Sequence, residues 1–169
     1  MLIKEILGNT ARQSLGKLNI DPLEMEWYEA TKRIQRKTSN GGTDLSIKFL
    51  KEGQRLHQGD ILWQDNEKAI VVHIKPCDAI VIKPETMLQM GTVCYEIGNK
   101  HMPLFIQDQL VLMPFEMPMF RWLEAGGYQP VKEKHQLLNL LKSNVEPHGH
   151  LGNTSLFSKI INIASKNDQ

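Results

Sequence analysis

The stretch from Cys94 to Leu104 constrains the fold most, because a helical pattern stops there and an apolar strand pattern begins. Before it, apolar and small residues recur at the spacing of one helix face. Gly98-Asn99 is typical of a helix C-terminus, and Pro103 blocks any continuation. We therefore predict a helix over residues 85–99, followed by a strand. The stripe on this helix consists of Met87, Met90, Gly91, Cys94, Ile97 and Gly98.

His101 falls at this helix end, and the pattern allows two placements. A helix that ends at Gly98-Asn99 puts His101 just beyond it, whereas a helix that persists to Pro103 puts His101 on the buried stripe. Both placements leave an imidazole at the rim of a packed element. The simplest interpretation is that this imidazole interacts with the helix dipole or hydrogen-bonds a carbonyl group. The alternative is a metal ligand.

The amino-acid composition excludes several classes of protein. Of the 169 residues, 41% are hydrophobic, which is enough for one ordinary domain or two small ones. The 20 basic and 19 acidic residues argue against a nucleic-acid partner, because proteins that bind one usually carry a basic excess. The chain shows no signal-peptide pattern, and no run approaches the ~20 apolar residues of a membrane span. We expect a cytoplasmic protein without a membrane partner.

Residues 1–75 predict a small all-β domain, because short strand patterns follow one another without a helical period. The strongest local signal is Ser39-Asn40-Gly41-Gly42, which favours a tight hairpin turn between strands at 31–38 and 44–50. The basic side of this hairpin is more often a solvated face than a binding site. Further strands are expected at 1–7, 23–27, 60–63 and 68–74, with a loop over 12–22.

The pattern changes at Lys75-Pro76, and residues 76–134 alternate between strands and helices. The order strand, helix, strand, strand, helix, strand is the ferredoxin-like βαββαβ arrangement. We therefore predict an α+β protein with an N-terminal β domain and a ferredoxin-like second domain. The expected elements are strand 79–82, helix 85–99 with Pro84 in its first turn, strands 103–106 and 110–113, helix 119–125 and strand 128–132.

Residues 135–169 are expected to form a flexible C-terminal tail, because proline and glycine residues interrupt the region. The leucines at 137–141 suit a short helix, and residues 156–164 suit another that is too short to be stable alone. His148 and His150 stand two residues apart, and an extended backbone lets both imidazoles bind one ion. The alternative is a solubilising tail whose histidines bind nothing.

Patterns of catalytic residues are missing from the sequence. Cys77 and Cys94 share no C-x-x-C arrangement, and Cys94 suits a small buried hydrophobe on the apolar stripe. Paired carboxylates, a Cys/His nucleophile arrangement and a phosphate-binding glycine loop are not found. The strands after residue 76 lack the interleaved aromatic residues that stack on RNA bases. We therefore expect a protein that is not an enzyme and does not bind nucleic acid.

Several separated motifs resemble a single family. Tyr95-Glu96-Ile97-Gly98-Asn99-Lys100-His101, preceded by Ile82-Lys83-Pro84 and Met87, is similar to the Glu/His-x-Gly-Asn-Arg/Lys-His signature of UreE, the urease accessory nickel metallochaperone. The resemblance covers roughly residues 1–130. The other matching motifs, in order, are Lys32-Arg33-Ile34, Arg36-Lys37-Thr38, Thr43-Asp44-Leu45-Ser46-Ile47 and Gly59-Asp60-Ile61-Leu62.

The resemblance implies a β domain like those that bind peptides, a ferredoxin-like metal-binding domain and a homodimer joined through the latter. It also implies a nickel ion held by His101 of both subunits and delivered to apo-urease through the urease accessory GTPase. In a symmetric dimer every ligand is doubled, and we expect His148 and His150 to complete the shell around the His101 pair. Zinc or copper is also expected to bind, because imidazole nitrogen suits all three metals.

Two departures from the family pattern limit this expectation. Residues 110–115 lack the second histidine pair that some members carry, and only His148 and His150 stand where many members have a histidine-rich tail. We therefore expect one transferable ion per dimer and not nickel storage. The alternative function is a chaperone-like adaptor, in which the β domain binds a peptide of a partner and metal is incidental.

Overall fold

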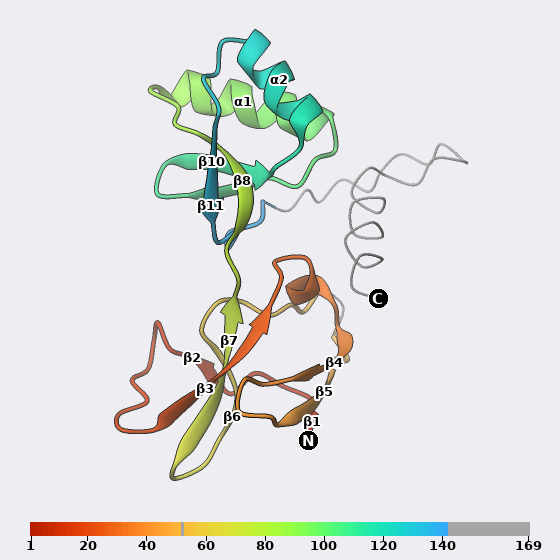
Figure 1. Cartoon of the computed structure of the whole chain (residues 1–169), viewed down its shortest axis with the longest axis vertical. Coiled ribbons are helices and arrows are strands. Elements are labelled where there is room, and N and C mark those ends of the chain that lie inside the picture. The colour runs from red at the N-terminus through yellow and green to blue at the C-terminus, as the bar shows by residue number, and fades with distance from the viewer. Residues whose placement is uncertain (52, 142–169) are drawn as a thin grey trace, which may run out of the picture. The chain divides into compact units, whose positions relative to one another are not determined.

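The computed structural model describes residues 1–51 and 53–141, and the chain divides into two compact units (Figure 1). The first unit is Met1–Pro76, and the second begins at Cys77. Strands dominate the first unit, and both α-helices of the described residues belong to the second. Neither of these two helices has the length and apolar content needed to cross a lipid bilayer. The α+β class predicted from the sequence is confirmed.

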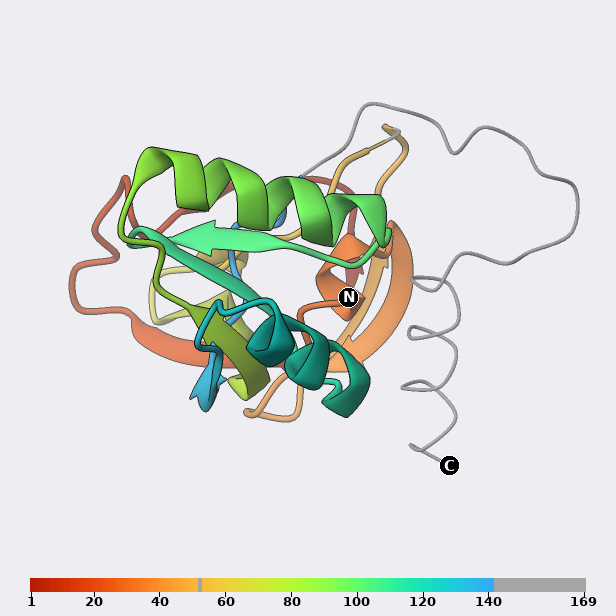
Figure 2. The same ribbon diagram turned by 90° about the horizontal axis from the view of Figure 1, so that it is seen from above.

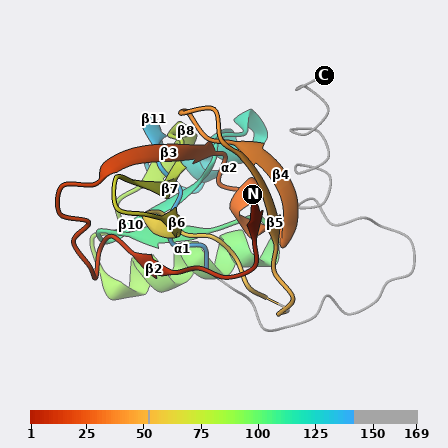
Figure 3. The same ribbon diagram turned by 90° about the horizontal axis from the view of Figure 1, so that it is seen from below.

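The first unit contains two sheets and a 3₁₀-helix at Glu29–Thr31 (Figure 3). In order across the sheet, the smaller one consists of β1 (Leu2–Ile3), β5 (Asp44–Lys48) and β4 (Ile34–Thr38). The larger one consists, in order, of β2 (Gly8–Asn9), β6 (Asp60–Gln64), β7 (Lys68–Ile74) and β3 (Asn19–Met25).

The hairpin predicted around Ser39–Gly42 is confirmed. β4 and β5 are antiparallel, and Gly42 has a φ of +81°, the left-handed conformation that favours glycine. Gly41 is needed for a different reason, because a Cβ there would lie 2.6 Å from a carboxylate oxygen of Asp21. The turn therefore packs against β3 as well as joining β4 to β5.

The start of β3 differs from the prediction, which placed a loop over 12–22 and a strand over 23–27. β3 begins at Asn19 because its backbone pairs in parallel with β7, starting with Asn19 opposite Lys68. This partner is far away in the chain, so no local pattern could indicate it. The loop prediction is wrong for residues 19–22.

The predicted N-terminal strand over residues 1–7 is wrong in its extent. β1 pairs with β5 in the smaller sheet, whereas β2 pairs with β6 in the larger sheet. Residues 4–7, which connect β1 to β2, form no strand. A segment that leaves one sheet and enters another does not keep one alternation of buried and exposed residues. The alternation over residues 1–7 therefore predicted a longer strand than the one that forms.

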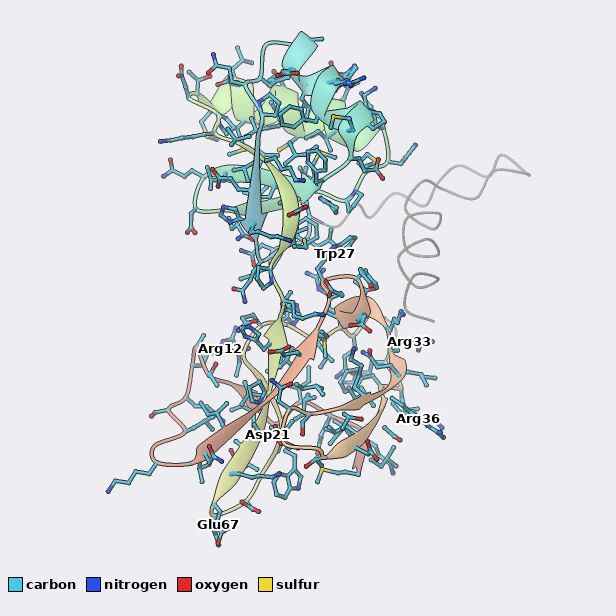
Figure 4. The ribbon with its side chains drawn as sticks, viewed as in Figure 1. Arg12, Asp21, Trp27, Arg33, Arg36 and Glu67 are labelled. Carbon is cyan, nitrogen blue, oxygen red and sulfur yellow. The ribbon has the colours of Figure 1, made fainter. Side chains whose placement is uncertain are left out.

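Asp21 is a buried carboxylate that joins β3 to the hairpin turn and to β7 (Figure 4). Ser39 Oγ and the Gly41 N–H each donate to it at 2.7 Å, and Lys68 Nζ lies 3.4 Å away. Burial alone would raise the pKa of Asp21, but these hydrogen bonds and the Lys68 charge outweigh burial and hold the pKa below its ordinary value. The ionised carboxylate therefore stabilises the first unit.

Replacing Asp21 by asparagine is expected to lower the free energy of unfolding by about 1–3 kcal/mol at pH 7, because an amide replaces a paired, hydrogen-bonded carboxylate. The folded-state pKa is lowered, so this stabilisation is complete above the unfolded-state pKa and is lost as the pH falls through the folded-state pKa. The difference between wild type and variant should therefore shrink below about pH 4. Urea unfolding at pH 7 and pH 3 measures both effects.

Glu67→Gln is the matched control, because Glu67 is exposed in the same unit and the substitution removes the same charge (Figure 4). It should change the free energy of unfolding by less than about 0.5 kcal/mol. Equal losses in the two variants, or an Asp21→Asn difference that stays constant down to pH 3, would contradict the role assigned to Asp21.

The second unit is a four-stranded antiparallel sheet that carries both helices on one face (Figure 2). The strand order β11-β8-β10-β9 and the chain order βαββαβ are those of the predicted ferredoxin-like fold. The helices pack on the sheet through buried aliphatic side chains, among them Ile80, Val111 and Leu123. The elements are β8 (Cys77–Ile82), α1 (Met87–Asn99), β9 (Phe105–Gln107), β10 (Leu110–Pro114), α2 (Met117–Ala125) and β11 (Val131–His135).

The residues after β11 lie along the opposite edge of this sheet and do not form the short helix expected at 137–141. Leu140 bridges to Phe105 of β9, and the Leu141 N–H donates to the Leu104 carbonyl oxygen at 2.7 Å. The expectation is wrong because these backbone groups pair with β9 instead of with one another. The described chain therefore ends beside the segment that leads into β9.

Candidate metal-binding site

Helix α1 begins at Met87, where Thr86 caps its N-terminus by accepting a hydrogen bond from the Gln89 N–H at 3.1 Å. The predicted start, with Pro84 in the first turn, is therefore too early. The helix ends at Asn99, as the sequence predicted. Its C-terminal end leads directly to the candidate ligand.

The face of α1 that is buried differs from the predicted stripe by a rotation about the helix axis. Val93 and Ile97 are fully buried in the core, and Met90 and Cys94 are half-buried at its edge. The pattern misplaced the stripe because it counted two glycines as core positions and omitted Val93. The members of the stripe that are exposed instead are Met87, Gly91 and Gly98.

His101 lies just beyond α1, which is the first of the two placements that the sequence allowed. Lys100 forms the C-cap, and the His101 N–H donates to the Gly98 carbonyl oxygen at 2.9 Å. The backbone of His101 has a φ of +54°, a left-handed conformation common after a helix end. Its side chain is exposed, and no residue in the ranges 1–51 and 53–141 hydrogen-bonds to the imidazole. The ring nitrogens are therefore open to a ligand.

Each of the other three histidines of the described chain contacts a polar neighbour. Within the described part of the chain, no three His, Cys, Asp or Glu side chains come together as a metal site. A tight site at His101 therefore needs ligands from a second copy or from the tail, and His148 and His150 lie outside the described residues. The polar contacts of the three other histidines are those of Arg55 with His57, Gln58 with His73 and Glu133 with His135.

Cys94 is half-buried on α1, with its Sγ 3.9 Å from Met90 Sδ. Burial raises the pKa of the Cys94 thiol, so the thiol stays protonated at neutral pH. Because the thiolate is the metal-binding form, this cysteine is a poor ligand candidate. It packs as the small hydrophobe that the sequence predicted.

The outward face of α1 is apolar and open. The side chains of Met87, Leu88 and Tyr95 are 87%, 80% and 69% exposed. A Cβ added at Gly91 or Gly98, on the same side of the helix, would meet no heavy atom of residues 1–51 and 53–141 within 4 Å. Exposed apolar side chains gathered on one helix face are suited to a contact with another molecule. The sequence pattern did not single out Leu88 and Tyr95, although their spacing of two helical turns was an available signal.

The fold and this site define a two-unit α+β protein whose ferredoxin-like unit presents an open imidazole at a helix end. Residues 3–75 match the family described as UreE urease accessory protein, N-terminal domain. A relative from Flavobacterium johnsoniae, named urease accessory protein UreE, is 55% identical over 164 residues, which cover 97% of this chain and 99% of the relative. The chain belongs to the UreE family of urease accessory proteins, as its motifs indicated.

More distant relatives carry the same name. One from Haemophilus influenzae is 44% identical and covers 88% of this chain and 82% of its own length. One from Acetivibrio thermocellus is 39% identical and covers 89% of this chain and 97% of its own length. These relatives are named as accessory proteins and not as enzymes.

Proposed function

We propose that this protein is a nickel metallochaperone, which delivers nickel to apo-urease through the urease accessory GTPase during urease maturation. The observation that supports this most directly is the open imidazole of His101 at the end of α1, in a chain of the UreE family. Imidazole nitrogen suits nickel, copper and zinc, so zinc or copper competes for the same ligands. The carrier acts in the cytoplasm, and nickel is its cargo.

The site is proposed to form in a homodimer, because one imidazole alone binds a metal ion weakly. The apolar outward face of α1 is suited to a symmetric contact with a second copy. Gly91 and Gly98 allow close approach of a second backbone, since none of the described residues stands in front of them. A two-fold axis near the C-terminal end of α1 brings both His101 side chains to one ion.

His148 and His150 are proposed to complete the ligand shell. Leu141, the last described residue, is hydrogen-bonded to Leu104, which follows His101 by three residues. His148 follows Leu141 by seven residues, and an extended chain of that length spans about 23 Å. This reach exceeds the short span from Leu104 back to His101, so the chain length permits the tail histidines to meet the same ion.

A carrier must hold its ion against competing ligands and still release it. His101 follows a packed helix and supplies the fixed anchor, whereas the two tail histidines are ligands that detach one at a time. Each step then breaks one metal–nitrogen bond, which keeps the barrier low. A partner that supplies its own ligands replaces the tail histidines first and the His101 pair last.

Nickel affinity is expected to fall by at least about tenfold between pH 7.5 and pH 5.5, because protons compete with the metal for neutral imidazole. Calorimetric titration with nickel at both pH values, with molecular mass measured alongside, tests the proposal. We expect one ion per two chains. Zinc should show the same pH dependence, since its ligands are the same. Unchanged affinity at pH 5.5 would rule out an all-histidine shell.

A chaperone-like adaptor is the second candidate function, and the outer face of the smaller sheet in the first unit favours it. Leu2 and Ile34 are exposed there, and Arg36, opposite Ser46, points away from the unit (Figure 4). A face that is both apolar and basic suits an acidic protein segment. The adaptor function requires partner binding to survive the loss of His101, whereas the carrier function requires nickel binding to be lost.

A further inference from the structure

The turn that carries His101 is fixed on both sides. On one side, Lys100 Nζ lies 4.1 Å above the centroid of the Trp122 ring, which is a close cation–π contact. On the other side, Met102 is only 7% exposed and belongs to the hydrophobic core. His101 is therefore an exposed residue between two anchored neighbours.

Trp122 is well placed to act as a fixed platform. It lies on α2, next to the fully buried Leu123, and its ring packs against the core of the second unit. Lys100 is the C-cap of α1, so the contact ties the end of one helix to the body of the other. The left-handed conformation carries a conformational cost for a residue with a Cβ, and contacts on either side of His101 help to offset it.

The contact also fixes the position of the positive charge on Lys100. Lys100 is the immediate neighbour of His101, and a free ammonium group beside a bound divalent cation would repel it. The contact with the Trp122 ring holds the ammonium group at a fixed place on α2, and the group keeps its positive charge. The Lys100–Trp122 contact therefore has two consequences beside His101: it restrains the turn, and it fixes where the Lys100 charge lies.

We infer that Trp122 is a positioning residue for metal binding at His101 and that it acts through Lys100. The inference rests on the proposed nickel-carrier function, and it names a residue on a different element from the ligand. This role of Trp122 differs from packing alone. If Trp122 only filled the core, the effect of replacing it would not depend on the side chain at position 100. The two roles can be separated by a double-mutant cycle.

The cycle compares Trp122→Leu, Lys100→Met and the double variant in the full chain, with nickel affinity measured by calorimetry at pH 7.5. Trp122→Leu is expected to weaken nickel binding about threefold to tenfold. In the Lys100→Met background the same substitution should change affinity less than about twofold. An equal loss in both backgrounds would assign Trp122 to packing alone, and no loss in either background would overturn the inference.

Two further variants separate the proposed role of Trp122 from misfolding and from the loss of any aromatic ring in the unit. Trp122→Phe retains an aromatic face and should stay within about threefold of wild type, which covers the case in which Trp122→Leu fails to fold. Phe115→Leu is the matched control: it removes the ring beneath Lys132 Nζ, 4.4 Å away in the same unit, and should leave nickel affinity unchanged. A loss with Phe115→Leu as large as with Trp122→Leu would contradict a specific role.

A measurement without metal separates failure of this inference from failure of the proposed function. The His101 N–H is hydrogen-bonded to Gly98, so its hydrogen exchange reports the closed turn. Trp122→Leu should speed this exchange about threefold to tenfold and leave the Val93 and Ile97 amides unchanged. If exchange responds but wild type binds no nickel, the carrier function fails while Trp122 still holds the turn. If exchange does not respond, the inference fails whatever the metal affinity.

Discussion

Replacing His101 by alanine is expected to abolish tight nickel binding while leaving both units folded. The side chain is exposed and hydrogen-bonds to no residue of the described chain, so its loss removes no stabilising contact. In the proposed dimer, one substitution removes two ligands at once. Loss of an outer partner of a metal ligand already costs 10–100-fold in affinity, so we expect at least about a hundredfold here. Calorimetry measures affinity, and thermal unfolding checks the fold.

His135→Ala is the matched control, because His135 is a histidine of the same unit whose ring pairs with Glu133 at 3.1 Å. It should leave nickel affinity unchanged. Replacing both His148 and His150 by alanine should weaken nickel binding about tenfold without abolishing it, because the His101 anchor remains. Nickel binding that survives His101→Ala but disappears in the tail variant would reverse the proposed roles.

Replacing Tyr95 by arginine is expected to convert the proposed dimer into a monomer. Tyr95 is 69% exposed and lies within two turns of the C-terminal end of α1, where the two-fold axis has to pass if the two imidazoles are to meet. The substitution places two like charges across that axis, and such contacts cost several kcal/mol when water is excluded. The dimer dissociation constant should rise at least about a hundredfold. Sedimentation of the metal-free protein measures it without interference from nickel.

Ala125→Arg adds the same charge on an exposed position of α2 and should leave the dimer intact. The fold of the second unit should survive in both variants, since neither position contributes to its core. If Tyr95→Arg remains a dimer that binds one nickel ion, the contact between copies lies on another surface, and the α1 face has to be assigned to a different partner.

Local sequence patterns predicted the order of the elements in the second unit, because each element carries its own signal. The end of α1 follows from Gly98-Asn99, and the hairpin of the first unit follows from Asn40-Gly41-Gly42. These features depend on residues close in the chain, where backbone conformational preferences act directly. The motif around His101 indicated the family for the same reason, since it is a contiguous segment.

Pairing between distant segments could not be predicted in this way. β3 starts at Asn19 because it pairs with β7, and residues 137–141 run along β9 because their backbone groups find partners there. The face of α1 that is buried was also misjudged, since it depends on how Val93 and Ile97 meet the sheet. Burial and strand pairing are properties of the assembled unit, and no window of local sequence contains them.

Local signals in the sequence predicted a helix end beside His101 in a ferredoxin-like unit, because capping residues and periodicity are local, but they allowed two placements of the histidine itself. The folded structure shows that His101 is exposed to solvent, that Lys100 lies over Trp122, and that the described chain ends beside Leu104. Each of these facts depends on contacts between elements that folding brings together. Local preferences can place a residue along the chain, but only packing decides what surrounds it.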